Sequence, residues 1–121
     1  MLVGIDIIDA TRMEKLIKNE HFLEKFFTEY EVNYISKKYS QTLSLAGIYT
    51  AKEAFLKALG IGIGGGINLK EIEVCHEESG RPYIKVSSSK AQKLLDSMNI
   101  KEIQISISHT DDLATAICTL H

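Results

Sequence analysis

Glu53 and Lys57 are residues whose types and spacing could do chemistry together. They lie in the segment 46–60, whose composition predicts one helix ending at Gly60, a residue that favours a left-handed cap. With about 3.6 residues per turn, side chains four positions apart share one side of a helix, so the acid and the amine face the same way. The stripe consists of Ala46, Thr50, Glu53 and Lys57. An ordinary surface ion pair, worth about 0.2–0.5 kcal/mol, has the same spacing.

Small residues border this stripe and leave space for another backbone to approach the helix closely. They are Gly47, Ala51, Ala54 and Ala58. A helix built only for packing would not need so many small residues beside its acid. Lys52 falls among the bulky apolar residues of the same helix, so we expect its stem to lie along them and its amine to extend outward.

Asp6 is the second informative residue, because it interrupts an apolar strand pattern at residues 2–8. Both faces of that strand are apolar, which predicts that it is covered on both sides. A buried carboxylate is strongly destabilising without a partner, so Asp6 needs a cation, a metal ion or hydrogen-bond donors. Gly4 leaves space on the same face. Asp9 ends the strand and is expected to cap a helix that starts near Thr11.

Composition restricts the class of protein. The chain has 121 residues, which predicts a single domain over residues 1–121. A formal net charge of −2 argues against nucleic-acid binding. Cys75 and Cys118 lie far apart and are expected to be free thiols in a reducing compartment. We find no signal peptide and no membrane-spanning pattern, so the sequence predicts a soluble, cytoplasmic protein.

The order of helix and strand patterns predicts an α+β fold with a mainly antiparallel sheet packed on the long helix. Thr28 and Glu31 have the spacing of a capping box, which would open one of the helices. The expected strands are 2–8, 72–74, 83–86, 102–109 and 113–120, and the expected helices are 11–18, 22–27, 28–38, 42–59 and one from Ser88 or Ser89 to Met98.

Two further patterns each have a plain and a functional interpretation. The glycine-rich run 61–66 could be a flexible turn, or its amides could approach a phosphate with Lys57 as counter-charge. It follows a helix and has no Gly-Lys-Ser/Thr, so it is not a P-loop. Ser108 and His109 point to opposite faces of a strand, so His109 cannot activate Ser108. No role is assigned to His21, His76 or His121.

Four segments together resemble a known family. They are Gly-Ile-Asp-Ile at 4–7, Ala-Lys-Glu-Ala-Phe-Leu-Lys-Ala at 51–58, Gly-Ile-Gly-Ile-Gly at 60–64 and Ser-Ile-Ser-His at 106–109. In order and separation they are similar to the holo-acyl-carrier-protein synthases, the small bacterial phosphopantetheinyl transferases. The resemblance implies an enzyme of fatty acid biosynthesis that transfers phosphopantetheine from coenzyme A to a serine of apo acyl carrier protein. Adenosine 3',5'-bisphosphate is then the second product.

The resemblance also implies roles for individual residues. Asp6 and Glu53 would be ligands of Mg²⁺, and Glu53 or a water molecule that it holds would accept the serine proton. Lys57 would reach the pyrophosphate and stabilise the leaving phosphate. The residues implied near coenzyme A are Lys57, Gly60, Gly62, Gly64, His109 and Thr110.

Members of this family are trimers with active sites between subunits, and their first helix docks the acidic carrier protein. Arg12, Lys15 and Lys18 would form that docking face here, although a solvated helix face has the same pattern. The chain departs from the family at Ile48, where an arginine is common. Lys37 or Lys38 could replace that phosphate contact.

Two other functions remain open at this point. A non-catalytic module that binds coenzyme A or a carrier protein could keep the fold, but it would not need Asp6, Glu53 and Lys57 together. Another Mg²⁺-dependent nucleotide phosphohydrolase could use the same acids and would release phosphate without a protein acceptor.

Overall fold

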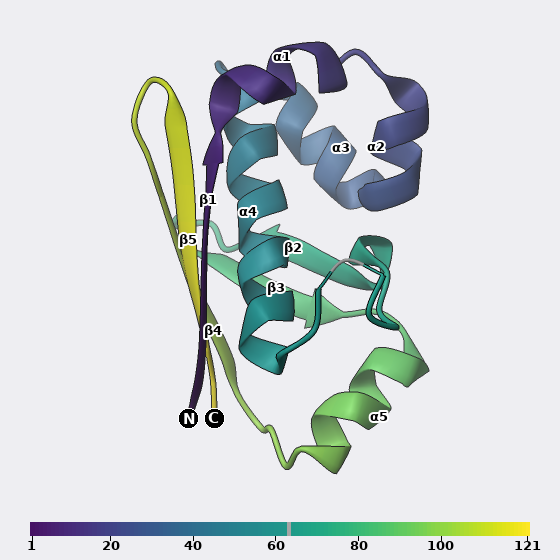
Figure 1. The fold of residues 1–121 in the computed structure, drawn as a ribbon. Helices are drawn as coiled ribbons and strands as arrows, with labels where there is room; N and C mark the ends of the chain where they lie inside the picture. The colour runs from purple at the N-terminus through teal and green to yellow at the C-terminus, as the bar shows by residue number, and fades with distance from the viewer. Residues whose placement is uncertain (63) are drawn as a thin grey trace.

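The structure is a computed structural model that describes residues 1–62 and 64–121. It contains five strands and five α-helices, with short 3₁₀ turns at Ala10–Arg12 and Leu69–Glu71 (Figure 1). In chain order the elements are β1 (Leu2–Asp9), α1 (Met13–Leu16), α2 (Glu20–Phe26), α3 (Glu29–Ser36), α4 (Gln41–Leu59), β2 (Ile72–His76), β3 (Pro82–Val86), α5 (Ser89–Ser97), β4 (Ile103–His109) and β5 (Leu113–Leu120). The predicted α+β class is confirmed.

The main sheet has the strand order β1-β5-β4, and both pairings are antiparallel. Its register places Asp6 opposite Ala116, and Ala116 opposite Ile107. The central helix α4 packs along one face of this sheet, while α1 to α3 gather around its first half (Figure 1). Asp6 therefore lies on one edge strand of the sheet and Ile107 on the other.

The close approach predicted from the small residues occurs between β1 and α4. A Cβ atom added to Gly4 would lie 2.0 Å from the carbonyl oxygen of Ala54 and 2.4 Å from the amide nitrogen of Ala58. The backbones of the strand and the helix thus touch at this point. A short side chain on α4 can consequently reach a short side chain on β1.

Local capping fixes the ends of α4. The Ser40 hydroxyl accepts a hydrogen bond from the amide of Leu43, and Gly60 has φ +81°, as a left-handed cap requires. Asp9 likewise accepts from the Thr11 amide at 2.9 Å, although the segment it caps is a 3₁₀ turn followed by the single turn of α1. The helix expected at 11–18 is therefore shorter and less regular than predicted.

The prediction that β1 is covered on both faces is wrong for the single chain. Gly4 and Ile8 are buried beneath α4, but Val3, Ile5 and Ile7 on the other face are 52%, 63% and 64% exposed. No layer formed by the described residues packs there, because α4 occupies the opposite face of the sheet. The outer face remains apolar and accessible.

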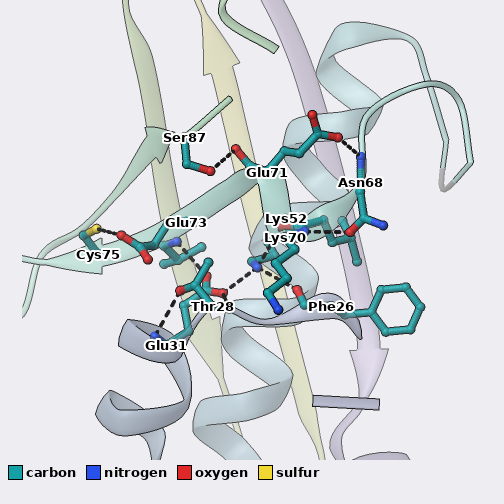
Figure 2. A network of polar contacts seen from close by, with 12 residues as sticks. Phe26, Thr28, Glu31, Lys52, Asn68, Lys70, Glu71, Glu73, Cys75 and Ser87 are labelled. Carbon is teal, nitrogen blue, oxygen red and sulfur yellow. Dashed lines mark hydrogen bonds and ion pairs between the residues drawn. The ribbon is translucent and has the colours of Figure 1, made fainter. Parts of the chain in front are cut away.

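The expectation that Lys52 extends outward is also wrong. Its side chain is fully buried, and its amine donates to Oε1 of Glu31 at 2.5 Å and to the carbonyl oxygens of Phe26 and Leu69, each at 2.9 Å. The Thr28–Glu31 capping box is present as predicted, and Glu31 also accepts from the amide of Val74 at 2.7 Å. Figure 2 shows this network, in which one amine joins α4 to three other segments. The prediction that the aliphatic stem of Lys52 lies among apolar side chains is correct, but the buried Glu31 carboxylate holds the amine inside the core.

The second half of the chain closes the core. Strands β2 and β3 form the predicted antiparallel hairpin, with Cys75 opposite Tyr83. Helix α5 begins after Ser88, whose hydroxyl accepts from the amide of Ala91. The last two strands then pair, and β1 lies beside β5, so both chain termini meet at one end of the sheet (Figure 1).

Candidate active site

Asp6 is held by hydrogen-bond donors on both of its carboxylate oxygens. The Thr50 hydroxyl donates to Oδ2 at 2.6 Å, and the Lys57 amine donates to Oδ1 at 2.9 Å. A third group, the Thr115 hydroxyl, donates to the main-chain carbonyl of Asp6 at 2.8 Å. The predicted stripe on α4 therefore faces the predicted acid on β1. This arrangement depends on the close approach of the two backbones at Gly4.

Glu53 lies beside this pair in an environment that disfavours its charge. Burial raises the pKa of Glu53 above its ordinary value, and the negative charge of Asp6 raises it further. A hydrogen bond from Tyr49 and the positive charge of Lys57 act in the opposite direction. Two carboxylates thus share a partly buried site with one amine, which leaves an excess of negative charge.

Tyr49 remains a hydrogen-bond donor at neutral pH. Burial and the neighbouring Glu53 carboxylate raise the pKa of Tyr49 to about 12, so its hydroxyl keeps its proton. The positive charge of Arg12 acts on the same phenol in the opposite direction, which brings Arg12 into the surroundings of the site. The aromatic residue at position 49 therefore supports Glu53 directly.

The carboxylates of Asp6 and Glu53 suit a hard divalent cation that keeps some other ligands, such as water molecules. Within the described residues, no group of three or more His, Cys, Asp or Glu side chains is placed to hold a metal. Asp6 and Glu53 alone can supply two carboxylates. Mg²⁺ is typically bound by one or two carboxylates and takes its remaining ligands from water and from substrate phosphates. The donor set fits that mode of binding and does not fit a closed structural metal site.

The glycine residues follow α4 directly, so they begin about one turn beyond Lys57. Gly60 and Gly64 have φ values of +81° and +83°, which favour glycine at these positions. Gly64 also lines a cavity of about 400 Å³ together with Lys25 and Lys90. The predicted loop includes Ile63, which lies outside the described residues. Gly62, the remaining predicted position, lies in this same loop.

His109 does not join Asp6, Glu53 and Lys57 within one chain, and Thr110 follows it in the turn to β5, where its amide donates to the Leu113 carbonyl. His109 ends β4, on the sheet edge opposite Asp6, and lines a pocket of about 200 Å³ with Ser44 and Gly47 of α4. On a helix, Ser44 and Glu53 point in opposite directions, since nine residues correspond to about two and a half turns. His109 and the group of Asp6, Glu53 and Lys57 therefore lie on opposite sides of α4.

The His109 pocket contains a second histidine that sequence reasoning left without a role. His76 lines the same pocket, and its ring stacks on that of Tyr34 at a centroid distance of 3.9 Å. Burial and the nearby Lys38 lower the pKa of His76. Its Nδ1 atom is buried and makes no hydrogen bond with the described residues.

The predicted docking residues Arg12, Lys15 and Lys18 are exposed. Arg12 belongs to the 3₁₀ turn that follows β1, and Lys15 belongs to α1. A different cavity of about 720 Å³ lies between α2 and α3 and contains none of the predicted site residues. Its lining includes Glu20, Glu24 and Glu29, whose charges disfavour a phosphate ligand.

Sequence reasoning missed the roles of Thr50 and Tyr49 in this site. Thr50 was visible on the same stripe as Glu53 and Lys57, and that shared stripe was the available signal. Tyr49 precedes it on the neighbouring side of the helix. Tyr49 lies four residues before Glu53 on the same helix, so helical spacing was an available signal for that contact. Thr50 cannot be assigned to Asp6 until the distance between β1 and α4 is known.

A family model described as the 4'-phosphopantetheinyl transferase superfamily matches residues 2–118. The chain is 42% identical over 118 residues to the holo-acyl-carrier-protein synthase of Caldanaerobacter subterraneus subsp. tengcongensis, covering 97% of this chain and 91% of that protein. Within the described residues, no helix is long and apolar enough to cross a membrane.

Two solved structures have the same fold. The holo-acyl-carrier-protein synthase of Helicobacter pylori, in complex with coenzyme A, matches with a TM-score of 0.86 and 33% identity, covering 99% of this chain and 100% of that chain. The synthase of Neisseria meningitidis matches with a TM-score of 0.89 and 27% identity, covering 100% and 99%.

Proposed function

Because this chain belongs to the 4'-phosphopantetheinyl transferase superfamily, we propose that it transfers phosphopantetheine from coenzyme A to a serine of apo acyl carrier protein. The reaction would depend on Mg²⁺ and release adenosine 3',5'-bisphosphate. The observation that carries this proposal is the meeting of Asp6 from β1 with Lys57 from α4, beside Glu53. Transfer of a phosphoryl group from a pyrophosphate to a hydroxyl requires charge neutralisation, a proton acceptor and a cation at the leaving group, and these three residues can supply them.

Asp6 and Glu53 are the residues that would hold Mg²⁺. Burial and, after it, the negative charge of Asp6 raise the pKa of Glu53, and a cation bound between the two carboxylates would favour their charged forms. Mg²⁺ bound there would neutralise charge on the pyrophosphate oxygens. Asp6 brings its ligand atom from the strand and Glu53 from the helix, so the close contact at Gly4 is needed for both to reach one ion.

Glu53 is the proposed proton acceptor. In the transfer, the serine oxygen forms a bond to the phosphorus that carries the pantetheine group, and the pyrophosphate bond to the adenosine bisphosphate breaks. The serine proton passes to Glu53 or to a water molecule beside it. A carboxylate within hydrogen-bond reach of the hydroxyl, directly or through one water molecule, is a suitable acceptor for its proton.

Lys57 is proposed to stabilise the leaving phosphate. Its side chain is 53% exposed, whereas that of Asp6 is 15% exposed, so the amine can leave Asp6 and turn toward a ligand in solvent. It also lies next to the start of the glycine loop, where Gly60 and Gly64 would admit a phosphate close to the backbone. A positive charge at the leaving oxygen lowers the barrier because negative charge develops there.

The complete site is proposed to form between subunits of a homotrimer. His109, implied near coenzyme A together with Thr110, lies across α4 from Lys57, so one ligand would contact His109 and Lys57 only if they came from different copies. The apolar outer face of the sheet offers a surface for such assembly, with Ile5 63% and Ile7 64% exposed on β1, and Ile117 42% exposed on β5. Ile5→Lys should then shift the sedimentation coefficient of the parent toward that of a monomer.

Arg12, Lys15 and Lys18 are proposed to dock the carrier protein. All three are exposed, and Arg12 is close enough to Tyr49 to influence its pKa. An acidic partner drawn to this surface would therefore arrive beside Glu53, where its serine has to react.

The deciding experiment is intact-mass spectrometry of an apo acyl carrier protein incubated with this protein, coenzyme A and Mg²⁺. We expect a mass gain of one phosphopantetheine that is lost with a chelator and with Asp6→Ala. Release of phosphate without carrier modification would instead indicate a phosphohydrolase. Binding of coenzyme A without either product, by a folded protein and with several carriers, would indicate a non-catalytic module.

A further inference from the structure

We propose that Thr50 is a positioning residue that fixes the orientation of the Asp6 carboxylate, while Lys57 is its exchangeable partner. The proposal rests on the function proposed above and assigns a role to a residue outside the set of Asp6, Glu53 and Lys57. It follows from the different surroundings of the two donors that share this carboxylate.

Thr50 is a permanent donor because solvent cannot replace it. Its side chain is fully buried, and its hydroxyl donates to Oδ2 of Asp6 at 2.6 Å, a short distance typical of a hydrogen bond to a carboxylate. Leaving such an oxygen without its donor in a partly buried site is unfavourable, since no water molecule can reach the position of the hydroxyl. Thr115 holds the main-chain carbonyl of the same residue from β5. Asp6 is thus fixed at its backbone and at one carboxylate oxygen.

Lys57 is an exchangeable donor. It binds the other oxygen, Oδ1, at 2.9 Å, but more than half of its side chain is exposed to solvent. Its long side chain can move to a phosphate without disturbing the core. When it does so, Thr50 keeps Oδ2 in place and Oδ1 remains directed toward the space that the amine has left. The carboxylate consequently presents one defined oxygen instead of rotating freely.

A threonine fits this position because the helix and the strand are in contact. Gly4 lies two residues before Asp6 on the same face of β1, and its Cα approaches the backbone of α4 at Ala54 and Ala58. The one-carbon reach of a threonine hydroxyl is sufficient across such a gap. Serine would keep the same donor, whereas valine would keep the shape of the side chain without it.

The test compares Thr50→Val and Thr50→Ser with the parent. Binding of Mn²⁺ is measured from the loss of the free-ion electron paramagnetic resonance signal, with coenzyme A present and no carrier protein. We expect Mn²⁺ to bind Thr50→Val on the order of tenfold more weakly than the parent, and Thr50→Ser to bind within about threefold. In the transfer assay, the Mg²⁺ concentration for half-maximal rate should rise by a similar factor in Thr50→Val, with KM for the carrier unchanged. Thr42→Val, the same substitution in the first turn of α4, is the matched control and should behave as the parent.

Several results would overturn the proposal. Equal Mn²⁺ binding by the parent and Thr50→Val would mean that Thr50 only packs in the core. An equal loss of Mn²⁺ affinity in Thr50→Ser and Thr50→Val would assign the effect to packing of the methyl group. If Thr50→Val does not fold, Thr50→Ala removes the hydroxyl without a larger apolar group and is judged by the same criteria. A parent that transfers no phosphopantetheine contradicts the proposed function itself. In that case the Thr50–Asp6 hydrogen bond can still be tested by thermal unfolding of Asp6→Ala, Thr50→Val and the double variant with chelator present. If the effects of the two substitutions on stability are additive, the two side chains do not interact.

Discussion

Replacing Lys52 and Lys57 by methionine in turn should separate stability from catalysis on a single helix. The two lysines are five residues apart on α4, and the substitution removes the same charge from each. Lys52 is fully buried against Glu31, whereas Lys57 is 53% exposed beside Asp6. We expect Lys52→Met to lose stability and Lys57→Met to lose activity.

The expected loss in Lys52→Met follows from the network in Figure 2. Removing one partner of a buried ion pair costs about 3–5 kcal/mol, because the other charge remains buried. The carbonyl oxygens of Phe26 and Leu69 lose a donor in the same step. The entropy of unfolding is about 2.1 cal/mol/K per residue, or about 0.25 kcal/mol/K for a chain of 121 residues. A loss of about 3–5 kcal/mol therefore lowers Tm by about 12–20 °C.

The same substitution should make stability depend on pH. Burial already raises the pKa of Glu31, and loss of the Lys52 charge removes an opposing effect. A carboxyl group whose pKa is higher in the folded than in the unfolded chain binds its proton preferentially in the folded state. Its contribution to stability is then full at acidic pH and is lost as the pH rises through the folded pKa. Lys52→Met should therefore recover part of its lost stability when the pH is lowered.

Thermal unfolding and transfer rates, measured on the same preparations, test this separation. Lys57→Met should unfold within about 4 °C of the parent, because an exposed ion pair contributes at most about 1 kcal/mol. Its rate of transfer should fall about 10²–10³-fold through loss of the charge at the leaving phosphate. If Lys52→Met loses less than about 1 kcal/mol, its amine is not buried in solution and the reasoning fails. A Lys57→Met enzyme with parental turnover would remove Lys57 from the chemistry.

Gly4→Ala should lower the free energy of unfolding by about 3 kcal/mol or more, because its Cβ would lie 2.0 Å from the Ala54 carbonyl oxygen. A parental urea midpoint would contradict the close approach. Arg12→Glu should raise the KM for the carrier on the order of tenfold at low salt and less at high salt, whereas an unchanged low-salt KM would exclude that docking surface. His76→Phe, which keeps the stack on Tyr34, should flatten the decline of Tm below about pH 6.5, since the lowered pKa of His76 makes the unfolded chain bind the proton first. If Tm declines equally with falling pH in the parent and in His76→Phe, His76 is not buried in the neutral form.

Features set by neighbouring residues were predictable from the sequence. The capping box of Thr28 and Glu31, the left-handed cap at Gly60 and the helix start after Ser88 each depend on hydrogen bonds or dihedral angles within a few residues. The small residues of α4 also predicted a close approach by another backbone, which occurs at Gly4 of β1. The composition of a short segment contains the information for such features.

The environment of Lys52 was not predictable in the same way. Helical periodicity correctly placed its stem among apolar side chains, but the destination of a long amine depends on which carboxylate lies within its reach. That carboxylate, Glu31, is 21 residues earlier and already had a complete local explanation as part of a capping box. Its second oxygen accepts from Val74, 43 residues later, so the buried pair exists only once α3, α4 and β2 are packed together.

The exposed outer face of β1 reflects a similar limit of local patterns. Apolar residues on both faces of a strand predict that both faces are covered, but they do not show whether the covering layer belongs to the same chain. Here α4 covers one face, and Ile5 and Ile7 on the other remain exposed. Assembly with further copies, as proposed above, would satisfy the original prediction without any additional element in the chain.

The dipeptide Lys52-Glu53 explains how α4 can serve both the core and the site. Consecutive residues on a helix point about 100° apart, so the amine turns into the core while the carboxylate turns toward Asp6. The environment that raises the pKa of Glu53 is unfavourable for its charge, and a helix free to rotate would relieve it by exposing the carboxylate. Lys52 opposes that rotation, because its amine is bound to segments that end α2, begin α3 and precede β2. The buried pair therefore holds Glu53 in the position beside Asp6 at which the transfer proposed above would use it.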